Sequence, residues 1–330
     1  MCIRDRSGTT DGSQIRFDNN PPTLGTVNIA SNNPEATLAK VGDNITLAIT
    51  ANESIDEPTV LINGDAADAI TVNDGDSLSW LAVTEITGGS SEGLLTFQVN
   101  FSDNAGNSGI GVTSLTGGDD GVTVDITQPQ ITKASIKSNN SLGDELSTPG
   151  DIITLEFTTS EDISTPGVTI ATQNAGSISK VDGSSRSWIA TYEMTNNEAA
   201  GTVPFTITFL DLTGNIGASS PHTSLLNDDD GNVVSFDKTQ PVLTTLSITS
   251  DNTPVEFAAY ARVNSVVTLS FAADRTLESS SIDVWINGNQ VTTSYDLGTN
   301  TYNAAYTLTD ADTEGFVTFT IDFTSITGYS

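Results

Sequence analysis

The sequence predicts an all-β protein built from tandem β-sandwiches. Composition, residue periodicity and an internal repeat each indicate this fold. Thr, Ser, Asn, Asp, Gly and Val are abundant in the 330 residues, and long stretches rich in Ala, Leu, Glu and Lys, which favour helices, are missing. Apolar and polar residues alternate along short segments, as they do in strands with one face on a core. The hydrophobic content of 36% allows several cores.

A block containing Phe-x-Val/Ile-x-Phe occurs three times. It begins at Gly93, Gly201 and Gly315, so that its copies are 108 and 114 residues apart. Two further features keep these offsets, namely an Ile/Val-Thr-Leu segment at 45–49, 153–157 and 267–271 and an aromatic residue at Trp80, Trp188 and Tyr302. A repeat of this length indicates that each copy is one structural unit.

Each unit contains about seven predicted strands in about 110 residues, which is the size of an immunoglobulin-like sandwich. Besides the strands named above, we expect first strands at 27–29, 134–136 and 246–248, middle strands at 60–62, 168–170 and 282–286, and a last strand before each proline. The alternation places Trp80 and Trp188 in cores, whereas Trp285 lies on the opposite phase and is expected to be exposed.

Prolines mark the junctions between the units. Because proline cannot donate to a ladder and restricts the preceding residue, each junction is expected to be a short, stiff link in a semi-rigid rod. We predict a non-native artefact at 1–6, the last strand of a preceding domain at 7–17, and immunoglobulin-like domains at 18–124, 125–236 and 237–330. The third domain is expected to lack its last strand.

Several motifs follow one another in fixed order. They are Gly-Asp-x-Ile-Thr-Leu from Gly42 and Gly150, a Ser-Glu turn at Ser160, a tryptophan strand, Glu-Gly-x-x-Thr-Phe, Asp-x-Ala/Thr-Gly-Asn and a closing Asp-x-Thr-x-Pro. Together they resemble the bacterial Ig-like repeats of large secreted and surface-anchored adhesins, over nearly all the chain after Arg6. The resemblance implies an extracellular module that extends, displays or attaches, often with Ca²⁺ at domain junctions. Cys2 is the only cysteine, so the paired cysteines of antibody-type domains are missing.

The charge balance excludes one class of partner. The 42 acidic and 11 basic residues give a formal net charge of −31, and no basic stripe exists that could neutralise phosphates. We therefore expect no binding to nucleic acid. No apolar run is long enough to span a bilayer. The acidic surface could collect divalent cations or serve only as a solvated surface.

Carboxylates gather at one pole of the first two predicted domains. The first set is Asp18, Glu53 and Asp103, and the second is Asp125, Glu161 and Asp211, with Asp119, Asp120, Asp228, Asp229 and Asp230 as possible extra ligands. Since Ca²⁺ takes six to eight oxygen ligands, we hypothesise that each set binds one Ca²⁺ ion as the only cofactor. The alternative is that these side chains cap their own turns.

The third domain departs from this pattern. Arg275 stands at the position of Glu161, and Ser325 at that of Asp211. The joint loss of both acids predicts no ion there, with Arg275 able to pair with Asp237 instead.

These observations predict an extracellular structural or adhesive array, the spacer or stalk of a bacterial surface or secreted protein. Its expected partners are neighbouring repeats and a cell-surface glycan or protein. The alternative is a set of accessory carbohydrate-binding or linking domains of a secreted polysaccharide-degrading enzyme. No catalytic residue is predicted, because every acidic cluster recurs with the repeat or lies in turns, whereas an active site is normally unique.

Overall fold

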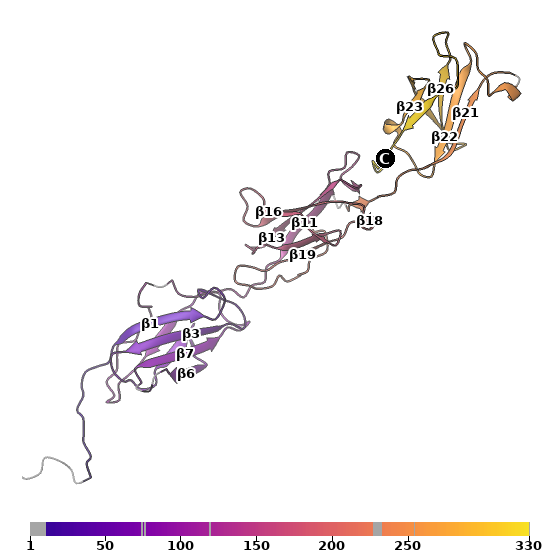
Figure 1. The fold of residues 1–330 in the computed structure, drawn as a ribbon. Coiled ribbons are helices and arrows are strands. Elements are labelled where there is room, and N and C mark those ends of the chain that lie inside the picture. Colours follow the sequence, from indigo (N-terminus) through magenta and orange to yellow (C-terminus); the bar gives the residue numbers. More distant parts are fainter. Residues whose placement is uncertain are drawn as a thin grey trace, which may run out of the picture. The chain divides into compact units, whose positions relative to one another are not determined.

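A computed structural model of the chain describes residues 11–329 apart from 74, 76, 119, 227–232 and 254. The predicted artefact at 1–6 lies outside the described residues. The strand ladders fall into three groups, which span 24–124, 131–236 and 243–322, and no ladder among the described residues joins two groups (Figure 1). We call these groups the first, second and third sandwich. Each has its own cluster of buried apolar side chains.

The first sandwich places a four-stranded sheet over shorter ladders. The sheet has the order β1 (Leu24–Ser31), β3 (Asn44–Ala51), β7 (Ser79–Glu85), β6 (Ala69–Val72). The other ladders are β5 (Asp65–Ala66), β4 (Thr59–Ile62), β9 (Phe97–Asn100) and β2 (Leu38–Ala39), β10 (Thr123–Val124), β8 (Gly93–Leu94). The described residues thus form ten strands rather than about seven, because four of the ladder segments are only two residues long. Side chains from both layers, including Leu47 and Val99, share one core.

The second sandwich repeats this arrangement. Its large sheet has the order β11 (Ile131–Ser138), β13 (Ile152–Thr159), β17 (Ser187–Glu193), β16 (Ser177–Lys180). The shorter ladders are β15 (Gln173–Asn174), β14 (Gly167–Ile170), β19 (Phe205–Thr208) and β12 (Leu146–Ser147), β20 (Ser235–Phe236), β18 (Gly201–Thr202).

The third sandwich keeps only two of these ladders among its described residues. They are β21 (Leu243–Ser250), β22 (Val266–Ala273), β26 (Thr301–Thr307), β25 (Thr293–Asp296) and β24 (Asn289–Val291), β23 (Asp283–Ile286), β27 (Phe319–Asp322). Two short 3-10 turns, η1 (Val255–Phe257) and η2 (Ser279–Ser281), lie in its loops.

The strand register confirms the sequence repeat. The aromatic residue of each unit faces the same position of the neighbouring strand, in the pairs Ile49–Trp80, Phe157–Trp188 and Phe271–Tyr302. A register shift also recurs near the start of each first strand. Trp80 and Trp188 are buried, at 8% and 4% exposure, while Trp285 is 40% exposed, as the alternation predicts.

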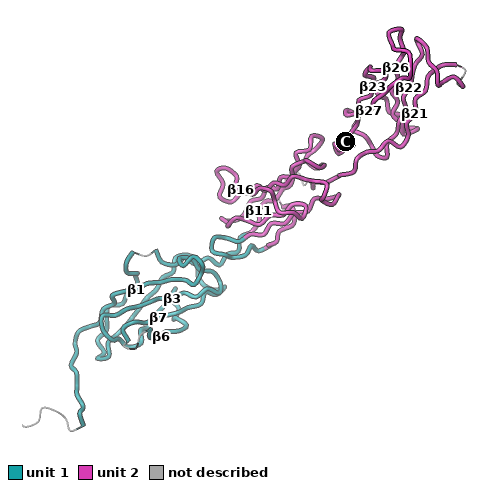
Figure 2. Tube along the Cα trace, viewed as in Figure 1, with its two compact units in different colours: residues 1–129, 210–218 teal, residues 130–209, 219–330 magenta. Residues whose placement is uncertain are grey.

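The chain divides into two compact units (Figure 2). Unit 1 comprises residues 1–129 and 210–218, and unit 2 comprises residues 130–209 and 219–330. The segment 210–218 belongs to unit 1 together with the first sandwich, although it follows β19. The Ala218 amide, for example, donates a 2.9 Å hydrogen bond to the carbonyl of Pro129. The domain boundaries at 124/125 and 236/237 stay predictions.

The segment before β1 pairs with no ladder among its described residues, 11–23. Ile15 and Phe17 in this segment are 100% and 87% exposed. Residues 7–10 of the predicted strand at 7–17 lie outside the described residues, and residues 11–17 belong to no strand of the structure, so this strand stays a prediction.

Candidate cation sites and a surface pocket

The first predicted acidic set lies together within unit 1. Asp18 precedes β1, Glu53 follows β3 and Asp103 follows β9, and each offers a carboxylate oxygen within 4.8 Å of the other two. Two oxygens on opposite sides of a Ca²⁺ ion at about 2.4 Å would be about 4.8 Å apart. The spacing of these donors therefore fits Ca²⁺, with backbone or water oxygens needed for the remaining positions.

Asp103 also caps its own turn, as the alternative interpretation predicts. Its Oδ1 accepts hydrogen bonds from the amides of Ala105 and Asn107, at 2.9 and 2.8 Å, and its Oδ2 accepts one from Asn107 Nδ2 at 2.8 Å. The Asn107 side chain is the main reason that the pKa of Asp103 is lowered. Asp103 is only 3% exposed. Capping and cation binding are compatible, because Oδ2 uses one acceptor direction for the side-chain bond and a carboxylate oxygen has two.

Asp18 is held from two sides. Its Oδ1 accepts from the Asn20 amide at 3.2 Å, and its Oδ2 lies 3.4 Å from Nη2 of Arg16, whose side chain is 88% exposed. The Asn107 side chain reaches the Asp18 carbonyl at 3.3 Å and so connects this segment to the turn after β9. An ion pair this exposed contributes little, so Arg16 does not neutralise the set.

The second predicted set is divided between the units. Asp125 and Asp211 belong to unit 1 and offer carboxylate oxygens within 4.8 Å of each other, and Glu161 belongs to unit 2. Burial raises the pKa of Asp125, and the negative charges of Asp211 and Glu92 raise it further. Glu92 has no place in the predicted set. Its carboxylate accepts a 2.6 Å hydrogen bond from the Thr127 hydroxyl.

Asp211 repeats the bonding of Asp103. Its Oδ1 accepts from the amides of Gly214 and Asn215, at 2.6 and 2.9 Å, and its Oδ2 accepts from Asn215 Nδ2 at 2.8 Å. Glu161 is half-buried, and its carbonyl accepts from the Thr159 hydroxyl. Of the possible extra ligands, Asp120 is exposed, and Asp119 and 228–230 lie outside the described residues.

The third sandwich carries the predicted replacement. Arg275 Nη1 lies 3.5 Å from Asp237 Oδ2 and donates to the Thr239 carbonyl at 3.2 Å. Ser325 is 1% exposed, and its Oγ accepts a hydrogen bond from the Tyr329 amide, four residues later in the chain. The Asp211 carboxylate accepts the equivalent bond from the Asn215 amide. The predicted pairing of Arg275 with Asp237 is therefore present.

A repeated contact that sequence reasoning missed joins neighbouring repeats. Asn33 Nδ2 donates to Asp43 Oδ2 at 2.7 Å and to the Thr213 carbonyl at 3.1 Å, and all three residues lie in unit 1. In unit 2, Asn140 Nδ2 donates to Asp151 Oδ2 at 2.7 Å and to the Thr327 carbonyl at 3.0 Å. Asn33 and Asn140 are 107 residues apart, and Asp43 and Asp151 are 108 apart, so the near-equal spacing could have indicated a common role but not the carbonyl partner.

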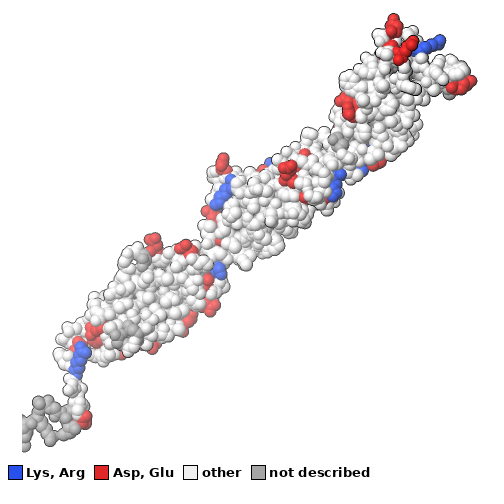
Figure 3. Space-filling view, in the orientation of Figure 1, with Lys and Arg blue, Asp and Glu red and all other residues white. Residues whose placement is uncertain are grey.

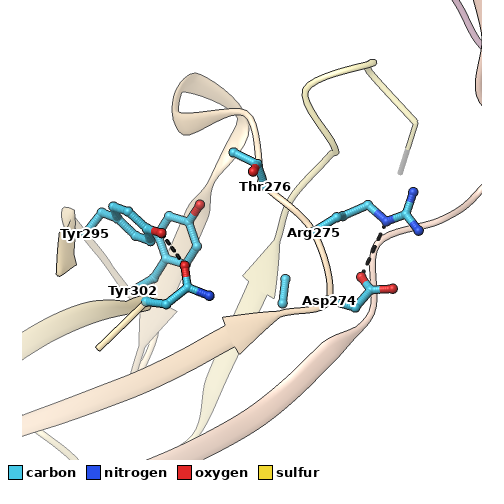
Figure 4. Close-up of a pocket in the computed structure, with 7 residues that line it drawn as sticks. Asp274, Arg275, Thr276, Tyr295 and Tyr302 are labelled. Atoms are coloured by element: carbon cyan, nitrogen blue, oxygen red, sulfur yellow. Dashed lines mark hydrogen bonds and ion pairs between the residues drawn. The ribbon is translucent and has the colours of Figure 1, made fainter. Parts of the chain in front are cut away.

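A pocket of about 230 Å³ opens on the third sandwich (Figure 4). Tyr295 of β25 and Tyr302 of β26 form one side, with ring centroids 4.7 Å apart. Asp274, Arg275 and Thr276, which follow β22, form the other, and Asn300 accepts a hydrogen bond from the Tyr295 hydroxyl. The Tyr295 side chain is 46% exposed and Tyr302 is buried.

The other sandwiches hold different residues at the position of Tyr295. Val72 pairs with Trp80 and Lys180 pairs with Trp188, as Tyr295 pairs with Tyr302. Lys180 Nζ lies 5.2 Å from the centroid of the Trp188 ring, in a cation–π contact. The tyrosine at this position thus distinguishes the third sandwich.

The surface carries mostly acidic charge. Figure 3 shows Asp and Glu side chains distributed over the visible faces of both units, with few Lys and Arg side chains among them. Among the described residues no helix is both long and apolar enough to cross a membrane.

The strand order, the strand register and the buried cores together identify the fold. The chain is a tandem array of immunoglobulin-like β-sandwiches. No protein-family model matches it. No curated protein sequence matches it either.

Several solved structures are similar to the chain in fold. The chain is similar to the I9-I11 tandem from titin, at 8% identity and a TM-score of 0.29, over 87% of this chain and 91% of that one. It is similar to the D1-D4 ectodomain fragment of ICAM-5, at 12% identity and a TM-score of 0.34, over 90% and 76% of the two chains. It is also similar to SGBP-B of a Bacteroides ovatus mixed-linkage glucan utilization locus, crystallised with a mixed-linkage heptasaccharide, at 15% identity and a TM-score of 0.21, over 92% and 65%. Each likeness concerns the fold alone.

Proposed function

We propose that this chain is an extracellular, non-catalytic array that acts as the spacer or stalk of a bacterial surface or secreted adhesin-type protein. The observation that carries the proposal is the repeated contact in which Asn33 and Asn140 bind a backbone carbonyl of the following repeat. A spacer needs a fixed link at each junction. The same link occurs twice at equivalent positions, which supports a mechanical role for the junctions.

Small-angle scattering of the N33A/N140A double variant tests this role. Each substitution removes a side chain that donates to both an aspartate and a carbonyl. The wild-type chain is expected to scatter as one stiff particle, and the variant as sandwiches on flexible links. The matched control is Asn63→Ala, within the first sandwich, where Asn63 binds Thr96. Equal flexibility of wild type and double variant, with all sandwiches folded, would contradict the proposal.

The acidic sets are proposed to bind Ca²⁺ and to stiffen the junctions. The support is the spacing of Asp18, Glu53 and Asp103, which fits the ion, and the replacement of acids by Arg275 and Ser325 in the third sandwich. An isolated group of three carboxylates within 4.8 Å also has unfavourable repulsion that a divalent cation would relieve.

Calorimetric titration of the EGTA-treated chain with Ca²⁺ tests the proposed ion sites. We expect binding and a rise in melting temperature. Glu53→Gln should weaken binding at the first set, because it removes a charged ligand and changes little else. Asp65→Asn is the matched control, since Asp65 is exposed on β5 and outside both sets. Absence of both heat and a rise in melting temperature would exclude the ions.

A second candidate function is the binding of a glycan, as an accessory carbohydrate-binding domain would do. The pocket beside Tyr295 supports it, because a half-exposed aromatic ring stands next to Asn300, Asp274 and Thr276. A sugar ring has an apolar C–H face and a rim of hydroxyl groups, which such a surface matches. At about 230 Å³ the pocket is smaller than the roughly 300–1,000 Å³ of drug-sized sites, so it suits one sugar unit.

A glycan array probed with the full chain tests this second function. Binding that Tyr295→Ala abolishes and Tyr260→Ala preserves would favour the carbohydrate-binding role, because Tyr260 is 69% exposed but does not line the pocket. Absence of binding to every glycan, or equal binding by both variants, would count against it.

A further inference from the structure

A stack of aromatic rings connects the core of the third sandwich to its pocket. Phe271 and Tyr302 are buried with their ring centroids 5.4 Å apart, and the Tyr295 ring follows at 4.7 Å from that of Tyr302. Tyr295 is the outermost of the three, and its hydroxyl donates a hydrogen bond to Asn300 Oδ1. Because the ring is held on one side and at its hydroxyl, a ligand can stack on it without the cost of ordering a mobile side chain.

The two charged groups that line the pocket compensate each other. Arg275 Nε lies 3.4 Å from Asp274 Oδ1, which also accepts a 2.9 Å hydrogen bond from the Val242 amide. Arg275 Nη1 lies 3.5 Å from Asp237 Oδ2 and donates to the Thr239 carbonyl. Figure 4 shows the guanidinium group and the Asp274 carboxylate directed away from the two tyrosine rings. Arg275 is thus no free counter-ion for an anionic ligand.

Two neutral groups of the pocket have hydrogen-bonding capacity to spare. Within the part of the chain that the structure describes, neither Asn300 Nδ2 nor Thr276 Oγ1 takes part in a hydrogen bond, and both residues line the pocket. The bond from the Tyr295 hydroxyl fixes which side of the Asn300 amide is the oxygen, so the free side is a donor. The Thr276 hydroxyl can both donate and accept. Sugar hydroxyls, which also do both, are suitable partners for these two groups.

We propose that this pocket selects an uncharged pyranose over the corresponding sugar acid. The apolar C–H face of the ring stacks on Tyr295, and its hydroxyl groups bond to Asn300 Nδ2 and Thr276 Oγ1. The inference rests on the second candidate function, the binding of a glycan, and adds the class of sugar.

A carboxylate on the sugar weakens binding for two reasons. It loses hydration on entering the pocket and finds no free cation there, because Arg275 is shared between Asp274 and Asp237. The net charge of −31 adds a long-range repulsion between the chain and any anion. Salt screens the long-range repulsion but not the cost inside the pocket, so the preference for the uncharged sugar should remain at high salt.

Ligand-detected NMR titration of the full chain tests this selectivity. The probes are the methyl glycosides of glucose, galactose and mannose, each measured beside the methyl glycoside of its hexuronic acid, in EGTA and at about 0.15 M and about 0.5 M salt. We expect at least one neutral glycoside to bind, with an affinity at least about tenfold higher than that of its acid at both salt concentrations. Tyr295→Ala should abolish this binding, and Tyr260→Ala should preserve it.

A charge variant shows whether the pocket itself makes the distinction. Asp274→Asn keeps an oxygen that can accept from the Val242 amide, but it leaves Arg275 with one counter-ion fewer. We expect this variant to lower the preference for the neutral glycoside by at least about threefold. Asp283→Asn is the matched control, because Asp283 is exposed on β23 outside the pocket and its loss changes the net charge equally. The control should keep the wild-type preference.

The outcomes separate the selectivity from glycan binding itself. An acid that binds as tightly as its neutral counterpart, or equal effects of Asp274→Asn and Asp283→Asn, overturns the selectivity and leaves glycan binding intact. Absence of binding by every probe also overturns the selectivity, and the glycan array then decides whether the glycan-binding function stands.

Discussion

Replacing Asp211 by alanine tests the account of the turns after β9 and β19. The Asp211 carboxylate is 2% exposed and accepts three hydrogen bonds, two from the backbone amides of Gly214 and Asn215 and one from Asn215 Nδ2. At about 1 kcal/mol net for each bond, their loss destabilises the chain by about 3 kcal/mol. For a domain of about 110 residues this corresponds to a fall in melting temperature of roughly 12–24 °C.

Calorimetric melting in EGTA measures this loss without any contribution from bound cations. The third sandwich suggests an intermediate variant, Asp211→Ser, because Ser325 at the equivalent place keeps the bond from the amide four residues on. We expect Asp211→Ser to lose less stability than Asp211→Ala. The neighbouring Leu212→Ala is the control: Leu212 is 62% exposed and should change stability by less than about 0.5 kcal/mol. A loss below about 1 kcal/mol for Asp211→Ala, or an equal loss for Leu212→Ala, would refute the reasoning.

Three further predictions concern other parts of the chain. Burial raises the pKa of Asp125 above its ordinary value of 3.8. The contribution of the protonated Asp125 carboxyl to stability is therefore fully present below pH 3.8, and it is lost as the pH rises through the folded-state pKa. In EGTA, Asp125→Asn should therefore melt higher than wild type at pH 7 and equally near pH 3, and a lower melting point at pH 7 would contradict this. The 2.6 Å hydrogen bond from the Tyr192 hydroxyl to Glu198 raises the pKa of Tyr192 to about 12. Ultraviolet titration of the Glu198→Gln variant should therefore show one tyrosine that ionises at lower pH than in wild type. Leu155 is fully buried, and Leu155→Ala should lower the free energy of unfolding in denaturant by about 2–5 kcal/mol. Leu94 is 62% exposed, and Leu94→Ala should lower it by less than about 0.5 kcal/mol. Similar losses for the two variants would be inconsistent with the assigned core.

The strands were predictable because their signal is local. Alternation at period two fixes which side chains share a face, and the offsets of 108 and 114 residues carry the assignment from one unit to the next. Trp80, Trp188 and Trp285 illustrate this, since alternation alone placed the first two inside and the third outside. The two-residue strands β2, β5, β12 and β15 escaped prediction because a segment that short has no periodicity, whereas β10 and β20 lie where a last strand was predicted before a proline.

The candidate sites were predictable only in part. The predicted common pole correctly grouped Asp18, Glu53 and Asp103. Aligned positions indicated that Arg275 replaces an acid, and Arg275 pairs with Asp237. The contact of Asn33 with the Thr213 carbonyl was not predictable, because a backbone carbonyl has no sequence signature and lies 180 residues away. The pocket beside Tyr295 likewise needs residues from three separate segments to be placed in space.

The sequence by itself therefore determined the strand pattern, the three-fold repeat and the loss of two acids in the third unit. Only the tertiary structure decided which apolar faces are covered. Val72 of β6 ends the same alternating pattern as Ile62 of β4, yet Val72 is 47% exposed and Ile62 is 2% exposed. The physical reason is that alternation specifies the direction of a side chain, whereas burial depends on whether another strand lies over it.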